Sequence, residues 1–471
     1  MLTEQDKIKH LYNRAGFGYA LSDIQSSRPL STTIEKLFSN KTYRSLQTVT
    51  FTEVESAKEK MKSSPKDAAK EIKKLLKDNI SDLNNLWFQE MIVSDAQLQE
   101  KMALFWHSHF ACRSVNPYFD QQYLDIIRKH ALGDFSTLLF EISKTPAMLQ
   151  FLNNQQNKKD HPNENFAREV MELFTLGRGN YTETDIKEAA RAFTGYGFDK
   201  VGSFKFKKQL HDFGVKTFQG KTGNFNGDDI LKIILGNKNC STFLVRKIFS
   251  FFVNEQVDEQ IVQSLSAQFF QSNYNIKQLM KTIFSSSWFY DEKNIGNKIK
   301  SPIVLLTGMF RLVPTIFTKP ENVLFLQRSL GQVLLFPPNV AGWKEGKAWI
   351  DSSSLLFRMQ LPQIIYFDKS LDMEPKEEIP EMYAAMQKIK SDYMKSFIAK
   401  KISVASDWTA IISHFMLSKS VTNDAAYFVL QQPADAMTLK AVVANSDFSS
   451  KQNEIKSTII NMMSLPEYQL C

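Results

Sequence analysis

Apolar residues recur at intervals of three and four along most of this chain, which is the spacing of one face of an α-helix. The pattern is clearest in three segments: 81–110, 163–177 and 182–195. Gly177 and Gly195 close the last two segments, as glycine commonly does at helix ends, and Asn163 and Thr182 precede them as candidate N-caps. The patterning predicts a mainly α protein, a multi-helix globular array.

The helical pattern is interrupted in the middle of the chain, at residues 196–224. Within this stretch "SFKFKK" alternates apolar and polar side chains, which is the period of a β-strand with one buried face. We therefore expect a short β-hairpin or an irregular insertion near 198–224.

A polar segment that contains prolines divides the chain near its last quarter. Three prolines bracket a polar stretch, after which helical patterning resumes. We predict a helical core over 1–360 that contains the insertion 196–226. A linker (361–380) and a small helical C-terminal region (381–471) are expected to follow.

The composition is that of an ordinary globular protein, since 43% of the 471 residues are apolar and 23% are charged. The net charge of +8 is spread over the chain. Its densest lysine run, within 58–77, is interleaved with acidic residues and lacks nearby aromatic stacking platforms. We interpret this run as a solvated helix face and do not expect nucleic acid as a partner. The three cysteines lie far apart without CxxC spacing, so they indicate neither a disulfide framework nor a thiolate zinc site.

The N-terminal stretch "MLTEQDKIKHLYNRAGFG" is polar from its first residues and lacks the apolar region of a signal peptide. No apolar run approaches the ~18–20 residues of a membrane span. We therefore expect a cytoplasmic protein without a transmembrane segment.

The stretch "HDFGVKTFQGKTG" (211–223) has some features of a phosphate-binding P-loop. A P-loop needs two glycines separated by four residues, a preceding buried strand, and a helix that begins at the Lys-Thr pair. Here Gly214 and Gly220 are separated by five residues, the preceding segment is too charged for a central strand, and further glycines delay any helix. We interpret the stretch as a polar loop instead. It carries three candidate functional side chains: His211, Asp212 and Lys216.

The sequence "FWHSHF" places His107 and His109 two residues apart. On a continuing helix their side chains would point about 200° apart and share a metal poorly. If the helix ends near Trp106 and the chain extends, both imidazoles face one side, where they suit zinc, iron, copper or nickel. The alternative is one core histidine and one solvated one. His161, in a polar loop that we expect to be exposed, is a further candidate ligand.

The segment "HPNENFAREVMELFTLG" (161–177) places Asn165, Glu169 and Glu172 on one face of a helix. Two carboxylates so placed can bind a cation, or act as an acid and a base if burial separates their pKa values. Arg168 lies beside them and can neutralise one. The same pattern also fits an ordinary amphipathic helix with a wet, charged face.

The loop "FPPNVAGWKEGKAWI" (336–350) contains Trp343 and Trp349 among glycines. Exposed tryptophans can stack on a sugar ring or a peptide. We favour the alternative, in which these rings pin the loop to the rest of its own domain.

Five of these motifs, in this order, resemble the bacterial domain-of-unknown-function family 1800. They are "HLYNRAGFG" (10–18), "MALFWHSHFA" (102–111), "HPNENFAREVMELFTLGRGNYTETDIKEAARAFTGY" (161–196), "HDFGVKTFQGKTGNFNGDDI" (211–230) and "FPPNVAGWKEGKAWI" (336–350). The resemblance runs from about residue 7 to 360 and implies no particular reaction. It directs attention to the polar residues inside the motifs: His107, His109, Asn163, Glu164, Asn165, Arg168, Glu169, Glu172, His211, Asp212 and Lys216.

The resemblance also implies a partner and a second location. Members are often encoded beside a second uncharacterised family related to sulfatases and phosphatases, which implies a partner of that kind. Some members carry export signals, which implies an extracytoplasmic role as the alternative to the cytoplasm.

These observations lead to three hypotheses. The first is a metal-dependent or acid–base enzyme, a hydrolase or oxidoreductase, with a His/Glu cleft and a divalent transition metal. The second is a non-catalytic binding or assembly scaffold that uses the same residues as buried polar networks. The third is a metal-free polysaccharide lyase or glycosidase, and the substrate expected for an enzyme is a polysaccharide or a peptide.

The first hypothesis assigns a role to each candidate side chain. The metal ligands are His107, His109, Glu169 and Glu172, and the catalytic candidates are Asn165, Arg168, Glu169, Glu172, His211, Asp212 and Lys216.

Overall fold

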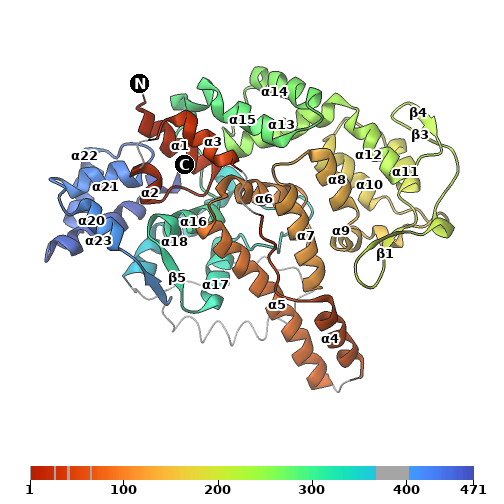
Figure 1. The fold of residues 1–471 in the computed structure, drawn as a ribbon, viewed down its shortest axis with the longest axis horizontal. Helices are drawn as coiled ribbons and strands as arrows, with labels where there is room; N and C mark the ends of the chain where they lie inside the picture. Colours follow the sequence, from red (N-terminus) through yellow and green to blue (C-terminus); the bar gives the residue numbers. More distant parts are fainter. Residues whose placement is uncertain (1, 26–27, 40–42, 64–65, 368–401) are drawn as a thin grey trace.

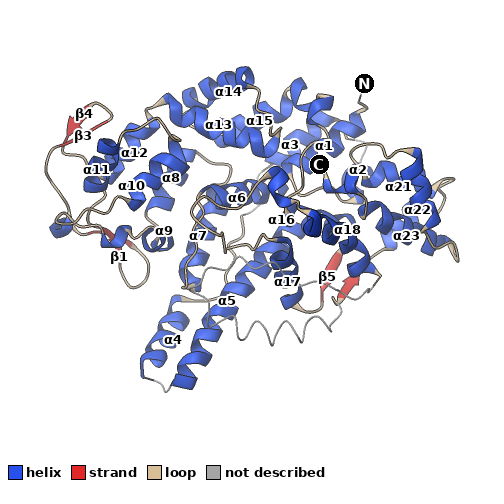
Figure 2. Ribbon diagram, turned by 180° about the vertical axis from the view of Figure 1, so that it is seen from behind, coloured by secondary structure: helices blue, strands red, loops and turns tan. Residues whose placement is uncertain are grey.

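The computed structural model describes residues 2–25, 28–39, 43–63, 66–367 and 402–471. This part of the chain is mainly α, as predicted, and its β structure consists of small two-stranded sheets (Figure 2). Most of the segment predicted as a linker, 361–380, lies outside the described residues, while 361–367 completes a helix and the residue after it.

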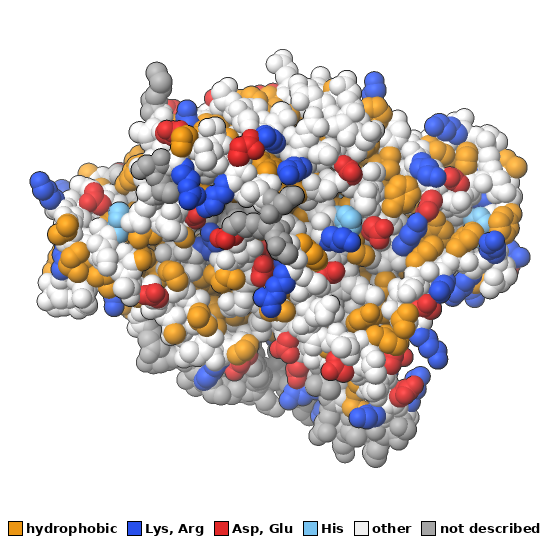
Figure 3. All heavy atoms as spheres, in the orientation of Figure 1, with side chains coloured by type: hydrophobic (Ala, Val, Ile, Leu, Met, Phe, Trp, Pro, Cys, Tyr) orange, Lys and Arg blue, Asp and Glu red, His pale blue; other side chains and the backbone are white. Residues whose placement is uncertain are grey.

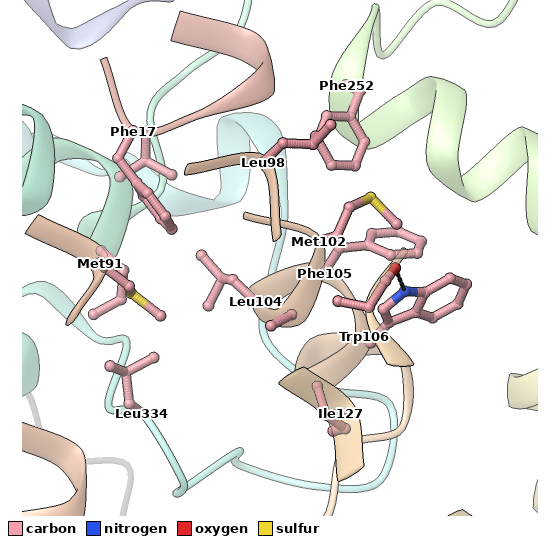
Figure 4. Packing of buried hydrophobic residues seen from close by; sticks show 14 of the residues in the cluster. Phe17, Met91, Leu98, Met102, Leu104, Phe105, Trp106, Ile127, Phe252 and Leu334 are labelled. Atoms are coloured by element: carbon pink, nitrogen blue, oxygen red, sulfur yellow. Dashed lines mark hydrogen bonds between the residues drawn. The ribbon is translucent and has the colours of Figure 1, made fainter. Parts of the chain in front are cut away.

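A central group of helices packs around α5 (Figure 1). Its members are α5 (Lys66–Val93), α6 (Gln97–His109), α7 (Pro117–His130), α16 (Pro302–Leu312) and α17 (Pro320–Leu330). Apolar side chains cover α6 on several sides (Figure 4), and the Trp106 indole N–H donates to the Ala131 carbonyl oxygen at 3.0 Å. The helix that carries both close-set histidines is therefore a core helix.

A buried polar network also crosses this core. The Glu100 carboxylate on α6 accepts hydrogen bonds from Arg128 Nη2 at 2.7 Å and from the Trp87 indole at 3.0 Å. Glu100 and Arg128 are both almost fully buried, so each charge depends on the other for compensation.

Helices from the N-terminus and from the middle of the chain pack together on one side of α6. They are α1 (Glu4–Ala15), α2 (Leu21–Gln25), α3 (Leu30–Phe38), α13 (Lys238–Phe252), α14 (Glu259–Gln271) and α15 (Ile276–Ser285). A capping box between Thr3 and Asp6 starts α1. On the other side, α4 (Phe51–Ser63) and α5 form a projecting helical hairpin that contains the lysine run. Figure 3 shows acidic and basic side chains interspersed over one face of the molecule.

Residues 135–235 form a lobe that we call the hairpin lobe (Figure 1). Its helices are α8 (Phe135–Ser143), α9 (Pro146–Phe151), α10 (Asn165–Glu169), a π-helix (Val170–Thr175), α11 (Glu183–Ala192) and α12 (Gly227–Leu235). Its antiparallel hairpins pair β1 (Tyr196–Phe198) with β2 (Phe204–Phe206) and β3 (Lys216–Phe218) with β4 (Lys221–Gly223). The insertion predicted near 198–224 is therefore confirmed as two short hairpins.

Local signals in the lobe agree with most sequence predictions. Thr182 caps α11 through a capping box, and Gly177 and Gly195 have the positive φ angles, +76° and +79°, expected after helix ends. The N-cap position of α10 is Glu164 rather than Asn163, whose side-chain oxygen instead accepts from the Asn165 backbone N–H. The Lys-Thr pair of the rejected P-loop lies in β4 and not at the start of a helix.

The C-terminal region packs on α18 (Ser352–Tyr366). It contains α20 (Thr409–Phe415), α21 (Val421–Val429), α22 (Ala436–Ala444) and α23 (Lys451–Met463), and its strand β6 (Val404–Ser406) pairs with β5 (Thr315–Phe317). The last residues return to the centre, where Cys471 pairs with Lys298 through both backbone groups. Among the described residues, no helix combines the length and apolar character needed to cross a bilayer.

Candidate functional site

The two predicted metal ligands on α6 point into a dry core, which we call the α6 core: the surroundings of His107 and His109. The His107 Nε2 atom accepts a hydrogen bond from the Leu335 backbone N–H at 3.0 Å. The edges of Trp87, Tyr123 and Trp343 surround its ring, with centroids 5.2–5.9 Å away. Burial lowers the pKa of His107 to about 3, so the imidazole is neutral at ordinary pH.

This contact also holds the 335–350 loop in place. Leu335 has a positive φ of 67°, and Gly342 lies so close to α6 that a Cβ atom there would come within 2.5 Å of the Ser108 carbonyl oxygen. Trp343 is buried against His107, while Trp349 is half-buried. Trp343 therefore pins the loop to the core, the alternative favoured from the sequence.

His109 is buried in a second aromatic environment. Its Nε2 atom lies 3.0 Å from the Phe174 carbonyl oxygen and donates to it, and rings that include Phe105 and Phe110 pack around it. Burial, reinforced by the charge of Lys247, holds the pKa of His109 well below its usual range. His109 is therefore a neutral hydrogen-bond donor that ties α6 to the π-helix.

The two imidazoles do not lie in the arrangement that a shared metal site requires. The helix α6 continues through His109 instead of ending near Trp106, so the rings leave it on different sides, and His107 and His109 have separate partners. Within the described ranges, no three His, Cys, Asp or Glu side chains are grouped as metal ligands would be. His161, the third candidate, is exposed as predicted.

The paired carboxylates lie on the half-exposed face of α10 and the π-helix, and we call Glu169, Glu172, Arg178 and Tyr181 the acidic turn. Arg178 Nε donates to Glu172 at 2.5 Å and the Tyr181 hydroxyl donates to it at 2.8 Å. These two hydrogen bonds lower the pKa of Glu172. Partial burial, followed by the charge of Glu172, raises the pKa of Glu169.

The π-helix is part of the reason for this placement. The N–H groups of Leu176 and Gly177 both donate to the Met171 carbonyl oxygen, at 2.8 and 3.0 Å, which closes a wider turn than an α-helix has. The chain then reverses at Gly177, where a side chain would collide with the Phe243 ring. This reversal brings Tyr181 back over Glu172.

Arg168 and Asn165 lie beside the acidic turn without entering its hydrogen bonds. Arg168 binds Glu183 through two nitrogens, each at 3.0 Å, and Glu164 at 3.2 Å. Arg168 therefore joins α10 to the first turn of α11 rather than neutralising Glu169 or Glu172 by direct contact. The Asn165 side chain is exposed.

Asp212 and Arg191 fix the loop of 211–216 to the far end of α11. Arg191 Nε donates to Asp212 at 2.7 Å, and Arg191 also binds Glu188 at 3.0 Å. The Arg191 bond is the main reason that the pKa of Asp212 is lowered. Asp212 is therefore bound through a residue in the last turn of α11, whereas Arg168 binds Glu183 in its first turn.

The other two loop candidates also hold the backbone of this loop. His211 is buried, and its Nδ1 atom lies 2.9 Å from the Thr194 carbonyl oxygen. Lys216 is buried as well, and its ammonium group donates to the carbonyl oxygens of Asp212 and Gly214 at 2.5 and 2.9 Å. These contacts give the three loop residues an internal, structural role.

The sequence-predicted residues therefore form three groups instead of one cleft. His109 meets the backbone and apolar side of the π-helix, whereas Glu169 and Glu172 lie on its half-exposed side. The loop residues form the third group. Arg178 and Tyr181 were missed because they follow the helix, although Gly177 and Gly179 signalled a chain reversal that could return them to it.

The comparisons with known proteins add a family but no activity. A sequence model described as "Protein of unknown function (DUF1800)" matches residues 10–470, which extends the resemblance beyond residue 360 through the C-terminal helices. The comparisons with curated proteins and with solved structures give no match.

Proposed function

This chain belongs to the DUF1800 family, and from that premise and the acidic turn we propose that it is an acid–base enzyme of the hydrolase class. The observation that carries the proposal is the pair Glu169 and Glu172, neighbouring carboxylates whose pKa values are displaced in opposite directions. Two neighbouring carboxyl groups with opposite pKa shifts are the usual way in which one site holds an acid and a base at the same pH.

Each carboxyl group has its own role. Glu169 keeps its proton to higher pH than an ordinary glutamate, so it serves as the general acid that protonates a leaving group. Glu172 stays ionised because Arg178 and Tyr181 donate to it, so it stabilises developing positive charge or takes a proton from water. The exposed amide of Asn165 is available to bind a polar substrate.

The substrate class that fits this pair best is a polysaccharide. Cleavage of a glycosidic bond uses one protonated and one ionised carboxyl group. Residues three apart on a helix have Cβ atoms about 5–6 Å apart, which is close enough for both groups to reach one bond. The proposal assigns no step to a metal, because His107 and His109, which would complete the ligand set, each serve a separate core contact.

The experiment is a hydrolysis screen of polysaccharides, with peptides as the second substrate arm, using wild type, Glu169→Gln and Glu172→Gln. We expect each variant to lower the rate by about 100-fold or more while it remains folded at the temperature of the assay. The matched control is Glu259→Gln, since Glu259 is also a surface carboxylate bound to an arginine, Arg246, at 2.7 Å. Equal activity of all three variants and wild type would reject the assignment of the acidic turn.

A binding or assembly scaffold is the second candidate function, and one observation favours it. Arg168, Asp212 and Lys216 are all engaged in bonds that join parts of the hairpin lobe to each other. A scaffold should lose stability when these bonds are removed and show no hydrolytic activity in the screen. The metal dependence predicted from the sequence is tested separately, by elemental analysis of untagged protein.

A further inference from the structure

A buried group of basic side chains lies around the last residue of the chain, Cys471, which pairs with Lys298. We call it the cation cluster: Arg14 on α1, Lys101 on α6, Lys298 and Lys300 on the segment before α16, and Arg358 on α18. Lys298 retains slight exposure, and the other four side chains are at least nine-tenths buried. A buried cation is costly unless an anion or hydrogen-bond acceptors compensate it.

Hydrogen bonds to the backbone bring these residues close together. Lys298 pairs with Cys471 through both backbone groups, and the Lys300 N–H donates to Gln469. Arg358 reaches the same segment, since its Nε donates to the Gln469 side chain at 3.1 Å and its Nη2 donates to the Lys300 carbonyl oxygen.

Arg14 and Lys101 approach from the N-terminal side. Arg14 Nη2 donates to the Asn294 carbonyl oxygen at 2.6 Å, a few residues before Lys298. The Lys101 ammonium lies 5.0 Å from the ring centroid of Phe17 and 5.8 Å from that of Phe251.

The compensation of these charges is incomplete. The Arg14 Nε and Nη1 atoms and the Arg358 Nη1 atom are buried and have no hydrogen-bond partner among the described residues. Lys101 forms no ion pair within the same residues. The acidic groups that act on the cluster are Glu255, which is 3.6 Å from Lys298, together with Glu345 and the negative charge at Cys471. Cys471 acts on all five basic groups, Glu255 acts on Arg14 and Lys298, and Glu345 acts on Lys298, so the basic groups outnumber the acidic ones.

We infer that the cation cluster is a binding site for a small tetrahedral oxyanion, phosphate or sulfate. Unpartnered guanidinium N–H groups on two arginines are charged donors that such an ion accepts from, and two lysines supply further charge. Burial beneath α1, α6 and α18 restricts the ligand to a small ion rather than a headgroup on a membrane surface. This site is separate from the acidic turn, so neither proposal depends on the other.

Burial lowers the pKa of Lys101 and of Lys300 to about 7 in the free protein. A bound anion favours the protonated forms, so binding should take up protons and weaken as the pH rises from about 6.5 to 8. Sulfate keeps a constant charge over this range, and a pH dependence of sulfate binding therefore reports on the protein alone.

The test is isothermal titration calorimetry on the full chain, purified without phosphate or sulfate, with inorganic phosphate and sodium sulfate as separate probes. We expect one site per chain, and proton uptake seen as a dependence of the heat on the ionisation enthalpy of the buffer. Lys101→Met and Arg358→Met should each weaken binding by about tenfold or more, because each removes a charged donor. Saturable binding of only one of the two ions would assign the ligand.

The matched control is Lys144→Met. Lys144 also lies over two phenylalanine rings, at 5.4 and 5.6 Å, but it has a carboxylate partner, Asp228, at 2.8 Å. Absence of saturable heat for both ions with wild type at pH 6.5 overturns the inference. Equal affinities of Lys101→Met and Lys144→Met also overturn it. If Lys101→Met does not fold, the wild-type melting temperature decides: sulfate must raise it along a saturation curve at millimolar concentrations, where its general salting-out effect is negligible.

Discussion

The α6 core and the acidic turn use polar side chains in opposite ways. In the α6 core, His107 and His109 are neutral, fully buried, and each makes one hydrogen bond to backbone. In the acidic turn, Glu169 and Glu172 reach solvent in part, and their neighbours displace their pKa values in opposite directions. Polar residues from the motifs that this family shares thus contribute to packing in the α6 core and titrate in the acidic turn. Burial and charged partners, rather than residue type, separate the two roles.

The largest expected effect is in the buried network of α6, and it tests how dry that core is. Glu100→Gln removes the carboxylate nearest to the buried Arg128 guanidinium, at 2.7 Å, and leaves the more distant Glu90, at 3.8 Å. We expect a loss of about 3–5 kcal/mol in the free energy of unfolding, measured by urea denaturation. The exposed pair Arg246–Glu259 is the control, and Glu259→Gln should cost about 0–1 kcal/mol. Similar losses in both variants would mean that the α6 core is not dry.

The next effect concerns the histidines themselves. His109→Ala removes a ring packed among phenylalanines and its bond to Phe174, so we expect a loss of about 2–4 kcal/mol in the same measurement. The exposed His161→Ala should stay within about 0.5 kcal/mol of wild type. If added transition metal stabilised wild type but not His109→Ala, that result would contradict the structural role of His109.

A pH series should separate the two carboxylates of the acidic turn. The folded state lowers the pKa of Glu172, so this residue contributes stability that is present above the unfolded pKa and is lost as the pH falls through the folded pKa. Glu172→Gln should therefore be less stable than wild type at neutral pH and equal to it in acid.

Glu169 should show the reverse sign in the same series. Its folded pKa is raised, so its ionisation above the unfolded pKa disfavours the folded state. Glu169→Gln should match wild type in acid and be at least as stable at neutral pH. Parallel profiles of stability against pH for Glu169→Gln and Glu172→Gln would remove the basis for assigning them different roles.

The smallest expected effect is that of Arg178→Ala. The Arg178 side chain is 87% exposed, so its loss should barely change stability. Its hydrogen bond is the first cause of the lowered pKa of Glu172, which should therefore rise in the variant. Carboxyl-carbon NMR titration measures this pKa, and Lys232→Ala, another exposed cation beside a carboxylate, is the control.

The sequence predicted the helices, the insertion and several helix ends because these depend on neighbouring residues. Thr182 and Gly177 act through their own backbone, so their roles could be read from local pattern. The π-helix could not be predicted from local pattern, because it depends on the packing of its apolar side against α6 and α13.

The candidate site was harder to predict because it depends on contacts between distant segments. The sequence left open whether α6 ends before His109, and only the surrounding core decides that it continues. The sequence pointed to the carboxylate pair, but the lowered pKa of Glu172 depends on Arg178 and Tyr181, which lie beyond the helix, and the raised pKa of Glu169 depends on its burial. The cation cluster draws on residues as distant as Arg14 and Arg358, which no local pattern links.

The hydrogen bond from Leu335 to His107 has a consequence for the order of events during synthesis. It joins residues 228 positions apart, and Trp343 covers the same imidazole. At about 5–20 residues per second, a ribosome needs roughly 10–45 s to make the intervening chain. During that interval the imidazole of His107 lacks the Leu335 and Trp343 contacts, so this part of the core can close only after the 335–350 loop has been made.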